Sequence, residues 1–217
     1  MDFLLSVWDF IVHLDQHLAL LVQNYGPWVY AILFAIVFCE TGLVVAPFLP
    51  GDSLLFIAGA LAAAGGMNVH LLVAVLILAA VLGDLVNFHI GAWLGPRVFK
   101  DNNAKYLKRE HLEKAHAFYE KWGGVAIILA RFTPFLRTYV PFVAGMARMT
   151  YAKFALYNIT GGVLWVAALC YIGFFFGNIP WIKANQGFMA IGIVVLSLIP
   201  VVIGALRSRV ASQQSAE

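Results

Sequence analysis

The stretch from Glu40 to Asp52 interrupts an apolar run that is otherwise long enough to cross a lipid bilayer. Besides its two carboxylates, it contains Pro47, Pro50 and Gly51. A charge in hydrocarbon costs about 2.5–3.5 kcal/mol on insertion scales, and each proline removes a backbone donor and breaks a helix. Freed carbonyls at membrane depth are tolerated only where they face protein or a water-filled cavity. The stretch therefore predicts a broken, re-entrant element that lines a site.

The composition places the rest of the chain in a membrane as well. Of its 217 residues, 62% are hydrophobic and 12% are charged, whereas soluble domains carry about 25% charged residues. We expect one integral membrane domain over residues 1–217. The net charge of +3 is too small to suggest nucleic-acid binding. The two cysteines have no metal-ligand spacing, and we expect neither a metal site nor a cofactor.

The apolar segments predict an all-α fold. Residues 28–46 and 53–64 lie on either side of the break, and the second is shorter than the roughly 20 residues that a spanning helix needs. This favours a hairpin that dips into the membrane and returns. Residues 68–95 and 154–177 are predicted to span, and residues 186–206 are predicted to form a C-terminal span.

Charge outside these segments sets the expected orientation. The loop 96–121 is strongly basic, which makes it cytoplasmic by the positive-inside rule. Its tail, from about residue 105, has an amphipathic helical pattern. Arg207 and Arg209 place the C-terminus in the cytoplasm. Residues 3–23 form a polar-striped helix that is expected to lie in the interface, on the outer side, because its flank is acidic and lacks Lys and Arg.

A second interrupted stretch, residues 122–147, mirrors the first with charges of the opposite sign. Its charges are Arg131 and Arg137, and it is predicted to break at Pro134, Pro141 and Gly145.

An internal repeat connects the two interrupted stretches. A shift of 82 residues lays Met67–Gly95 on Met149–Gly177 without a gap. The order of interfacial helix, broken hairpin and span occurs twice, over about 3–95 and 105–177. The first span must run inward to the basic loop and the second outward, so the repeats are predicted to be inverted. In secondary transporters of this design, broken helices form the substrate site near the midplane.

Two acids and two arginines could then meet in one site. If the hairpins meet at their tips, the charges of Glu40 and Asp52 offset those of Arg131 and Arg137. Guanidinium groups suit bidentate phosphate binding, and carboxyl groups in an intermittently wetted apolar cavity can exchange protons. We expect an anionic, phosphate-bearing substrate on the arginines and proton coupling through the acids. A purely structural ion-pair lock is the alternative.

Asp84 and Asn87 on the first span are second-tier candidates, for which a structural polar contact within the bundle is the favoured interpretation. Trp165 lies near the middle of the second span, away from the interfacial belts where such aromatics usually lie.

These residues bring a family resemblance with them. The pattern Glu40…Pro47-x-x-Pro50-Gly51-Asp52, followed by Arg131-Phe132-x-Pro134-x-x-Arg137 and Gly145, resembles the DedA family, also called the VTT or SNARE-associated superfamily. The resemblance covers roughly residues 25–177. It implies two oppositely oriented re-entrant hairpins, a bacterial inner-membrane location, and essential acids and arginines at Glu40, Asp52, Arg131 and Arg137.

The resemblance also implies a function. Bacterial members act in lipid homeostasis, cell division and envelope stress resistance and depend on the proton motive force; some recycle undecaprenyl phosphate, and eukaryotic relatives scramble phospholipids. The leading hypothesis is a flippase for a phosphate-headed lipid, most plausibly undecaprenyl phosphate. A proton-coupled cation or drug antiporter is disfavoured by the arginines, which repel cations. A non-transporting assembly factor stays open, as does homo-oligomerisation. An enzyme is not expected, because the central stretches offer no catalytic histidine and no metal-binding acid cluster.

Overall fold

The structure is a computed structural model, and it describes residues 14–43, 51–98, 124–177 and 179–180. Every regular element in these ranges is helical. Four predicted features lie wholly or largely outside the described residues: the start of the helix 3–23, the hairpin tip with Pro47 and Pro50, the basic loop with its amphipathic tail, and the C-terminal span 186–206.

Among the described residues, three apolar segments are long enough to cross a membrane, namely Leu18–Gly42, Val69–Gly95 and Tyr151–Phe176. The last two belong to the two long helices of the bundle, α5 (Val69–Val98) and α8 (Tyr151–Phe176). Their many exposed apolar side chains are typical of a surface that faces lipid. The chain is therefore a multi-pass membrane protein, and its described part is all-helical.

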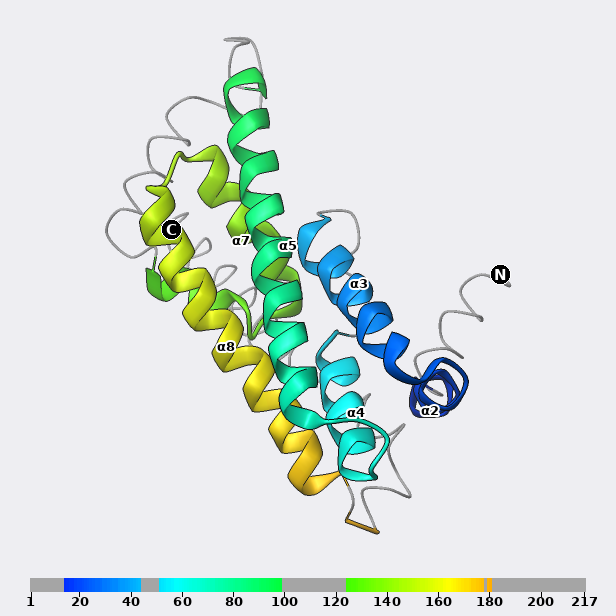
Figure 1. Ribbon diagram of the computed structural model, residues 1–217. Helices are drawn as coiled ribbons and strands as arrows, with labels where there is room; N and C mark the ends of the chain where they lie inside the picture. Colours follow the sequence, from blue (N-terminus) through cyan, green and yellow to red (C-terminus); the bar gives the residue numbers. More distant parts are fainter. Residues whose placement is uncertain (1–13, 44–50, 99–123, 178, 181–217) are drawn as a thin grey trace, which may run out of the picture.

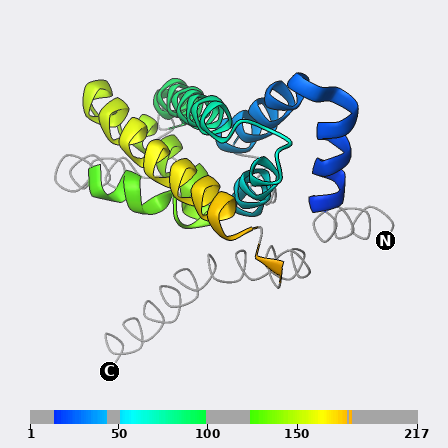
Figure 2. The same ribbon diagram turned by 60° about the horizontal axis from the view of Figure 1, so that its bottom comes forward.

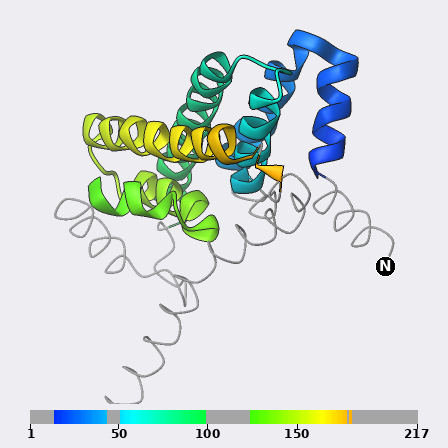
Figure 3. The ribbon, with the colours of Figure 1, turned by 90° about the horizontal axis from the view of Figure 1, so that it is seen from below.

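The first apolar segment is bent. It consists of part of α2 (Leu14–Tyr25), the short 3₁₀ helix η1 (Gly26–Trp28) and α3 (Val29–Gly42). Gly26 has a φ of +49°, which non-glycine residues seldom adopt. In Figure 1, α2 is seen end-on while α3 runs across the view, so α2 lies transverse to α3. The views in Figures 2 and 3 place α2 at the periphery, beside α3 and α4.

Besides the short helical segment over residues 124–130, two short helices complete the described bundle. The first, α4 (Gly51–Ala63), is almost entirely buried, and it packs mainly against α8. The second, α7 (Pro134–Met146), packs mainly against α5. In each half of the chain, the short helix thus leans on the long helix of the other half (Figure 1).

Glycines allow this crossed packing, because a helix without a Cβ at the contact lets another backbone approach closely. On α4 and α8, a Cβ at Gly59 would overlap the carbonyl of Cys170, and one at Gly173 would overlap the carbonyl of Phe56. The same reciprocal arrangement occurs between α7 and α5. There, Gly145 meets the Phe88 carbonyl and Gly91 meets the Phe142 carbonyl.

The prediction that Pro141 and Gly145 break the second stretch is wrong, because α7 runs through both residues. A proline inside a helix removes one backbone hydrogen bond, and packing by neighbouring helices can compensate for it in a membrane protein. Gly145 serves the contact with α5 instead of a break. Pro134 is the first residue of α7 and does mark a helix start. At this position the backbone N–H that proline lacks would have no partner within the helix.

Candidate functional site

Arg137 on α7 binds two carboxylates that come from the two sides of the first interrupted stretch. Its Nη1 lies 2.8 Å from Asp52 Oδ1 on α4. Its Nη2 donates to Glu40 Oε1 on α3. All three side chains are buried, with 5%, 6% and 1% of the Arg137, Asp52 and Glu40 surfaces exposed. The end of α3, the start of α4 and the first turn of α7 therefore meet at one buried ion cluster.

The start of α4 is shaped around Glu40. The Gly51 backbone N–H donates to Glu40 Oε1 at 3.2 Å, at a helix end whose unpaired amides and positive dipole favour an anion. A Cβ at Gly51 would lie only 2.6 Å from Glu40 Cδ, so a side chain cannot be present there without moving the carboxylate. The other carboxylate oxygen, Oε2, is buried and has no hydrogen-bond partner in the described part of the chain.

Trp165 on α8 completes this cluster from the opposite side. Its indole Nε1–H donates to Asp52 Oδ1 at 2.9 Å, the same oxygen that accepts from Arg137. The Arg137 guanidinium carbon lies 5.1 Å from the centroid of the indole ring, within the range of a cation–π contact. Trp165 is 1% exposed. The residue that stood apart from the interfacial aromatics in the sequence is therefore a part of the charged site.

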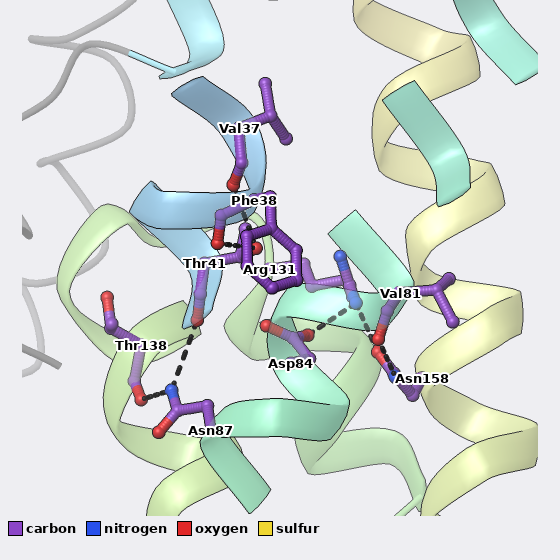
Figure 4. A network of polar contacts seen from close by, with 9 residues as sticks. All are labelled: Val37, Phe38, Thr41, Val81, Asp84, Asn87, Arg131, Thr138 and Asn158. Carbon is purple, nitrogen blue, oxygen red and sulfur yellow. Dashed lines mark hydrogen bonds and ion pairs between the residues drawn. The ribbon is translucent and has the colours of Figure 1, made fainter. Parts of the chain in front are cut away.

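Arg131 belongs to a second cluster, shown in Figure 4. Its Nη2 donates to Asp84 Oδ2 on α5 and to Asn158 Oδ1 on α8. Asn158 is oriented by its own Nδ2, which donates to the Val81 carbonyl at 3.0 Å. Gly161 provides the room for the arginine, because a Cβ there would lie 2.9 Å from Arg131 Cδ.

Asn87 on α5 lies between the segments that carry the Arg137 cluster. Its Nδ2 donates to the Thr41 carbonyl at 3.2 Å and to the Thr138 carbonyl at 2.8 Å (Figure 4). Thr41 directly follows Glu40, and Thr138 directly follows Arg137. A single side-chain amide thus joins the end of α3 to α7 beside the ion pair; we call it the Asn87 clasp.

The two clusters are unequal in charge. Within the described ranges, the buried ionisable residues of acidic or basic type are three carboxylic acids (Glu40, Asp52, Asp84) and two arginines. With every group ionised, the set carries one excess negative charge. A buried excess charge is costly. Taking up a proton would remove this excess negative charge, so the set is suited to proton exchange.

The sequence-predicted residues divide as follows. Glu40, Asp52 and Arg137 lie together, whereas Arg131 lies with the second-tier candidate Asp84 and not at the meeting point of the hairpin acids. Gly51 contacts Glu40 directly. Sequence reasoning missed Asn158, a neutral polar residue in an apolar helix. The Gly161-Gly162 pair one turn later was the available signal that a large side chain is accommodated there. No group of metal-binding residues occurs in the described part of the chain.

The charged residues are buried inside the bundle, and its long helices expose apolar side chains. These two features define a multi-pass membrane protein with a polar site inside. The family model of the VTT domain matches residues 49–175. The chain belongs to the DedA family, as the resemblance predicted.

Relatives agree with this assignment over most or all of their length. The chain is 52% identical to Protein DedA of Escherichia coli (strain K12), over 100% of both chains. It is 42% identical to an uncharacterized membrane protein of Mycobacterium leprae (strain TN), covering 78% of this chain and 76% of the relative. It is 37% identical to the inner membrane protein YqjA of E. coli (strain K12), covering 80% and 78%. No solved structure matches the chain.

Proposed function

We propose that the protein is a bacterial inner-membrane lipid translocase that moves a phosphate-headed lipid, undecaprenyl phosphate, between leaflets. The observation that carries this proposal is the Arg137 guanidinium, which is buried between two carboxylates at the broken start of α4. A planar guanidinium is the side chain best suited to bind a phosphate in two places at once. Envelope homeostasis and cell division are the processes that such an activity would support.

The proposed membrane arrangement follows the crossed packing. In it, α5 and α8 span in opposite directions, while α3 with α4, and residues 124–130 with α7, form two inverted re-entrant hairpins. The interrupted helix ends then lie at depth, where irregular backbone must face protein or water. Inverted repeats with broken helices place substrate sites at this level in secondary transporters. In this orientation the C-terminus is cytoplasmic, and α2 lies along the outer interface.

Competition for the arginines provides the proposed coupling. In the state described here, carboxylates occupy both guanidinium groups. An anionic headgroup that binds Arg137 takes the place of Glu40 and Asp52, and a carboxylate that loses its cation in a buried site favours taking up a proton. Headgroup binding and proton uptake are then two sides of one exchange, and a proton gradient can drive the lipid in one direction.

Two alternatives are weaker. A cation or drug antiporter would have to bind a cation beside two buried arginines, which repel it. An assembly factor without a transported substrate would use the charges as a lock, and the buried Glu40 Oε2 without a hydrogen-bond partner in the described part of the chain argues against this, because an unsatisfied buried acceptor weakens a lock. We propose no enzymatic activity, no cofactor and no nucleic-acid partner.

The deciding experiment is transport by purified protein in liposomes. Labelled undecaprenyl phosphate and an ordinary phospholipid are each placed in one leaflet, with and without a proton gradient. We expect gradient-dependent movement of the phosphate-headed carrier, lost in Arg137→Gln. Arg148→Gln, which removes a guanidinium from the exposed turn before α8, is the matched control and should keep full activity. Wild-type protein that moves neither lipid would contradict the proposal, and equal movement of both would make it a general scramblase.

A further inference from the structure

The two acids that bind Arg137 have different surroundings. Asp52 Oδ1 accepts two hydrogen bonds, from Arg137 and from Trp165 Nε1, at 2.8 and 2.9 Å. Glu40 Oε1 accepts from Arg137 and, at a longer 3.2 Å, from the Gly51 backbone. Glu40 Oε2, in contrast, is buried without a partner in the described part of the chain. Glu40 is also the more deeply buried of the two side chains.

This asymmetry decides what happens when Arg137 moves to another anion. Asp52 keeps the hydrogen bond from the Trp165 indole N–H. The indole can donate but not accept a hydrogen bond, so it stabilises the ionised carboxylate. Glu40 keeps one long backbone hydrogen bond and one oxygen without a donor. An ionised carboxylate in that position is costly, whereas a neutral carboxylic acid is much less so.

We propose that the two acids divide the work: Glu40 is the proton carrier, accepting the proton at Oε2, and Asp52 remains an anion that Trp165 holds in place to recapture Arg137. Trp165 is a positioning residue in this scheme. The inference rests on the proposed lipid translocation and adds the identity of the proton-carrying group to it.

Other charged groups around Glu40 fit the assignment. Facing it are Arg137 from α7 and Asp52 from α4, and α8 contributes the uncharged indole of Trp165 to the same cluster. From α5, Asp84 interacts electrostatically with Arg137 but is bound to Arg131 and Asn158. Asp84 therefore keeps a cation when Arg137 leaves, and Glu40 is the acid left with the fewest stabilising groups.

The internal repeat gives independent support for a special role of Trp165. The shift of 82 residues that aligns α5 with α8 pairs Trp165 with Gly83. At Gly83 the absence of a side chain lets α3 pack closely, since a Cβ there would lie 2.9 Å from the Phe38 carbonyl oxygen. At the equivalent place α8 has an indole that reaches Asp52. The two halves therefore differ at this equivalent position: the first has Gly83, and the second has Trp165, which donates to Asp52.

The test is infrared difference spectroscopy of purified protein in lipid, recorded during pH titration. The carbonyl stretch of a protonated carboxylic acid reports each acid without requiring transport. We expect one titrating band from the site, absent in Glu40→Gln and present in Asp52→Asn and Asp84→Asn. These amide substitutions keep the shape of each side chain and its acceptor oxygen, and size-exclusion chromatography checks that the variants are folded. In Trp165→Phe, which keeps a ring beside Arg137 but removes the donor to Asp52, a second band should appear.

The outcomes separate this inference from the proposed function. Loss of the band in Asp52→Asn or Asp84→Asn with retention in Glu40→Gln would overturn the assignment, as would the absence of any titrating band in the wild type. Liposomes containing Glu40→Gln should move labelled undecaprenyl phosphate down its own gradient but lose the response to a proton gradient, whereas Asp52→Asn should move none. If no variant and no wild type moves lipid, the proposed function fails while the spectra still decide which acid takes the proton.

Discussion

Arg131 and Asp84 form a buried ion pair. Arg131 directly follows the helical segment 124–130, and Asp84 lies in the middle of α5. The pair ties the second half of the chain to the first, and Asn158 adds a third helix to it. Arg137, by comparison, binds the acids at the broken end of α3 and the start of α4. The two arginines of one short motif thus serve separate contacts, one between long helices and one at the helix breaks.

Removing one member of the Arg131–Asp84 pair should destabilise the protein strongly. Asp84→Leu leaves Arg131 buried with only the Asn158 amide, and breaking a buried pair in this way costs about 3–5 kcal/mol. The double variant Asp84→Leu/Arg131→Leu should recover part of that loss, because it leaves no uncompensated charge. Thermal unfolding of detergent-purified protein measures both. Purely additive losses in the two single variants and the double variant would contradict a direct pairing.

The Asn87 clasp makes a second prediction. Asn87→Leu removes both donors and leaves the Thr41 and Thr138 carbonyls without them, at about 1–3 kcal/mol for each buried group left unsatisfied. Asn87→Asp should be at least as harmful, because it turns carboxylate oxygens toward two carbonyl oxygens.

The matched control is Thr41→Val. The clasp uses only the backbone carbonyl of Thr41, and the hydroxyl bonds separately to the Val37 carbonyl at 2.9 Å. This variant should lose much less stability than Asn87→Leu and should keep transport. Equal losses in Thr41→Val and Asn87→Leu, by thermal unfolding, would assign the effect to the region and not to the clasp.

Gly51→Ala should impair the site without removing any of its charges. The new methyl group would overlap the Glu40 carboxylate and push it away from Arg137 and from the α4 amide. We expect a large loss of lipid transport in liposomes with only a small change in the yield of folded protein. Gly66→Ala is the control: its Cβ would lie 3.1 Å from Val22 Cγ1 and 3.4 Å from the Leu61 carbonyl oxygen, so a shift of a few tenths of an ångström accommodates it and no charged residue is displaced. Full transport by Gly51→Ala would show that the Glu40 position is not critical.

The crossed glycine contacts predict a different kind of defect. Gly173→Val or Gly145→Val would drive a side chain into the backbone of the facing helix, and overpacking of this kind typically costs about 1–3 kcal/mol or more. We expect lower folded yield and a lower melting temperature in both variants. Val163→Leu enlarges an exposed apolar side chain on α8 and should change neither. A tolerated Gly173→Val would mean that α4 and α8 can separate without loss.

The sequence predicted the helical class, the approximate ends of α5 and α8, and the residues that would be charged and buried, because these follow from hydropathy and from the cost of charge in hydrocarbon. It did not predict which charges pair. The choice between Asp84 and the hairpin acids depends on where Arg131 leaves its helix and on the room at Gly161, which are properties of tertiary packing. Pro141 misled for a related reason: a proline is a strong local signal against a helix, and contacts with α5 overrode it.

The reciprocal glycines have a consequence for how the two halves specify each other. Each half buries its short helix on a long helix that only the other half supplies, so neither half alone offers a complete partner surface. Among the described residues, recognition between the halves is encoded in matched backbone faces. In this respect the two halves identify one another in the way that two different subunits of a heterodimer do.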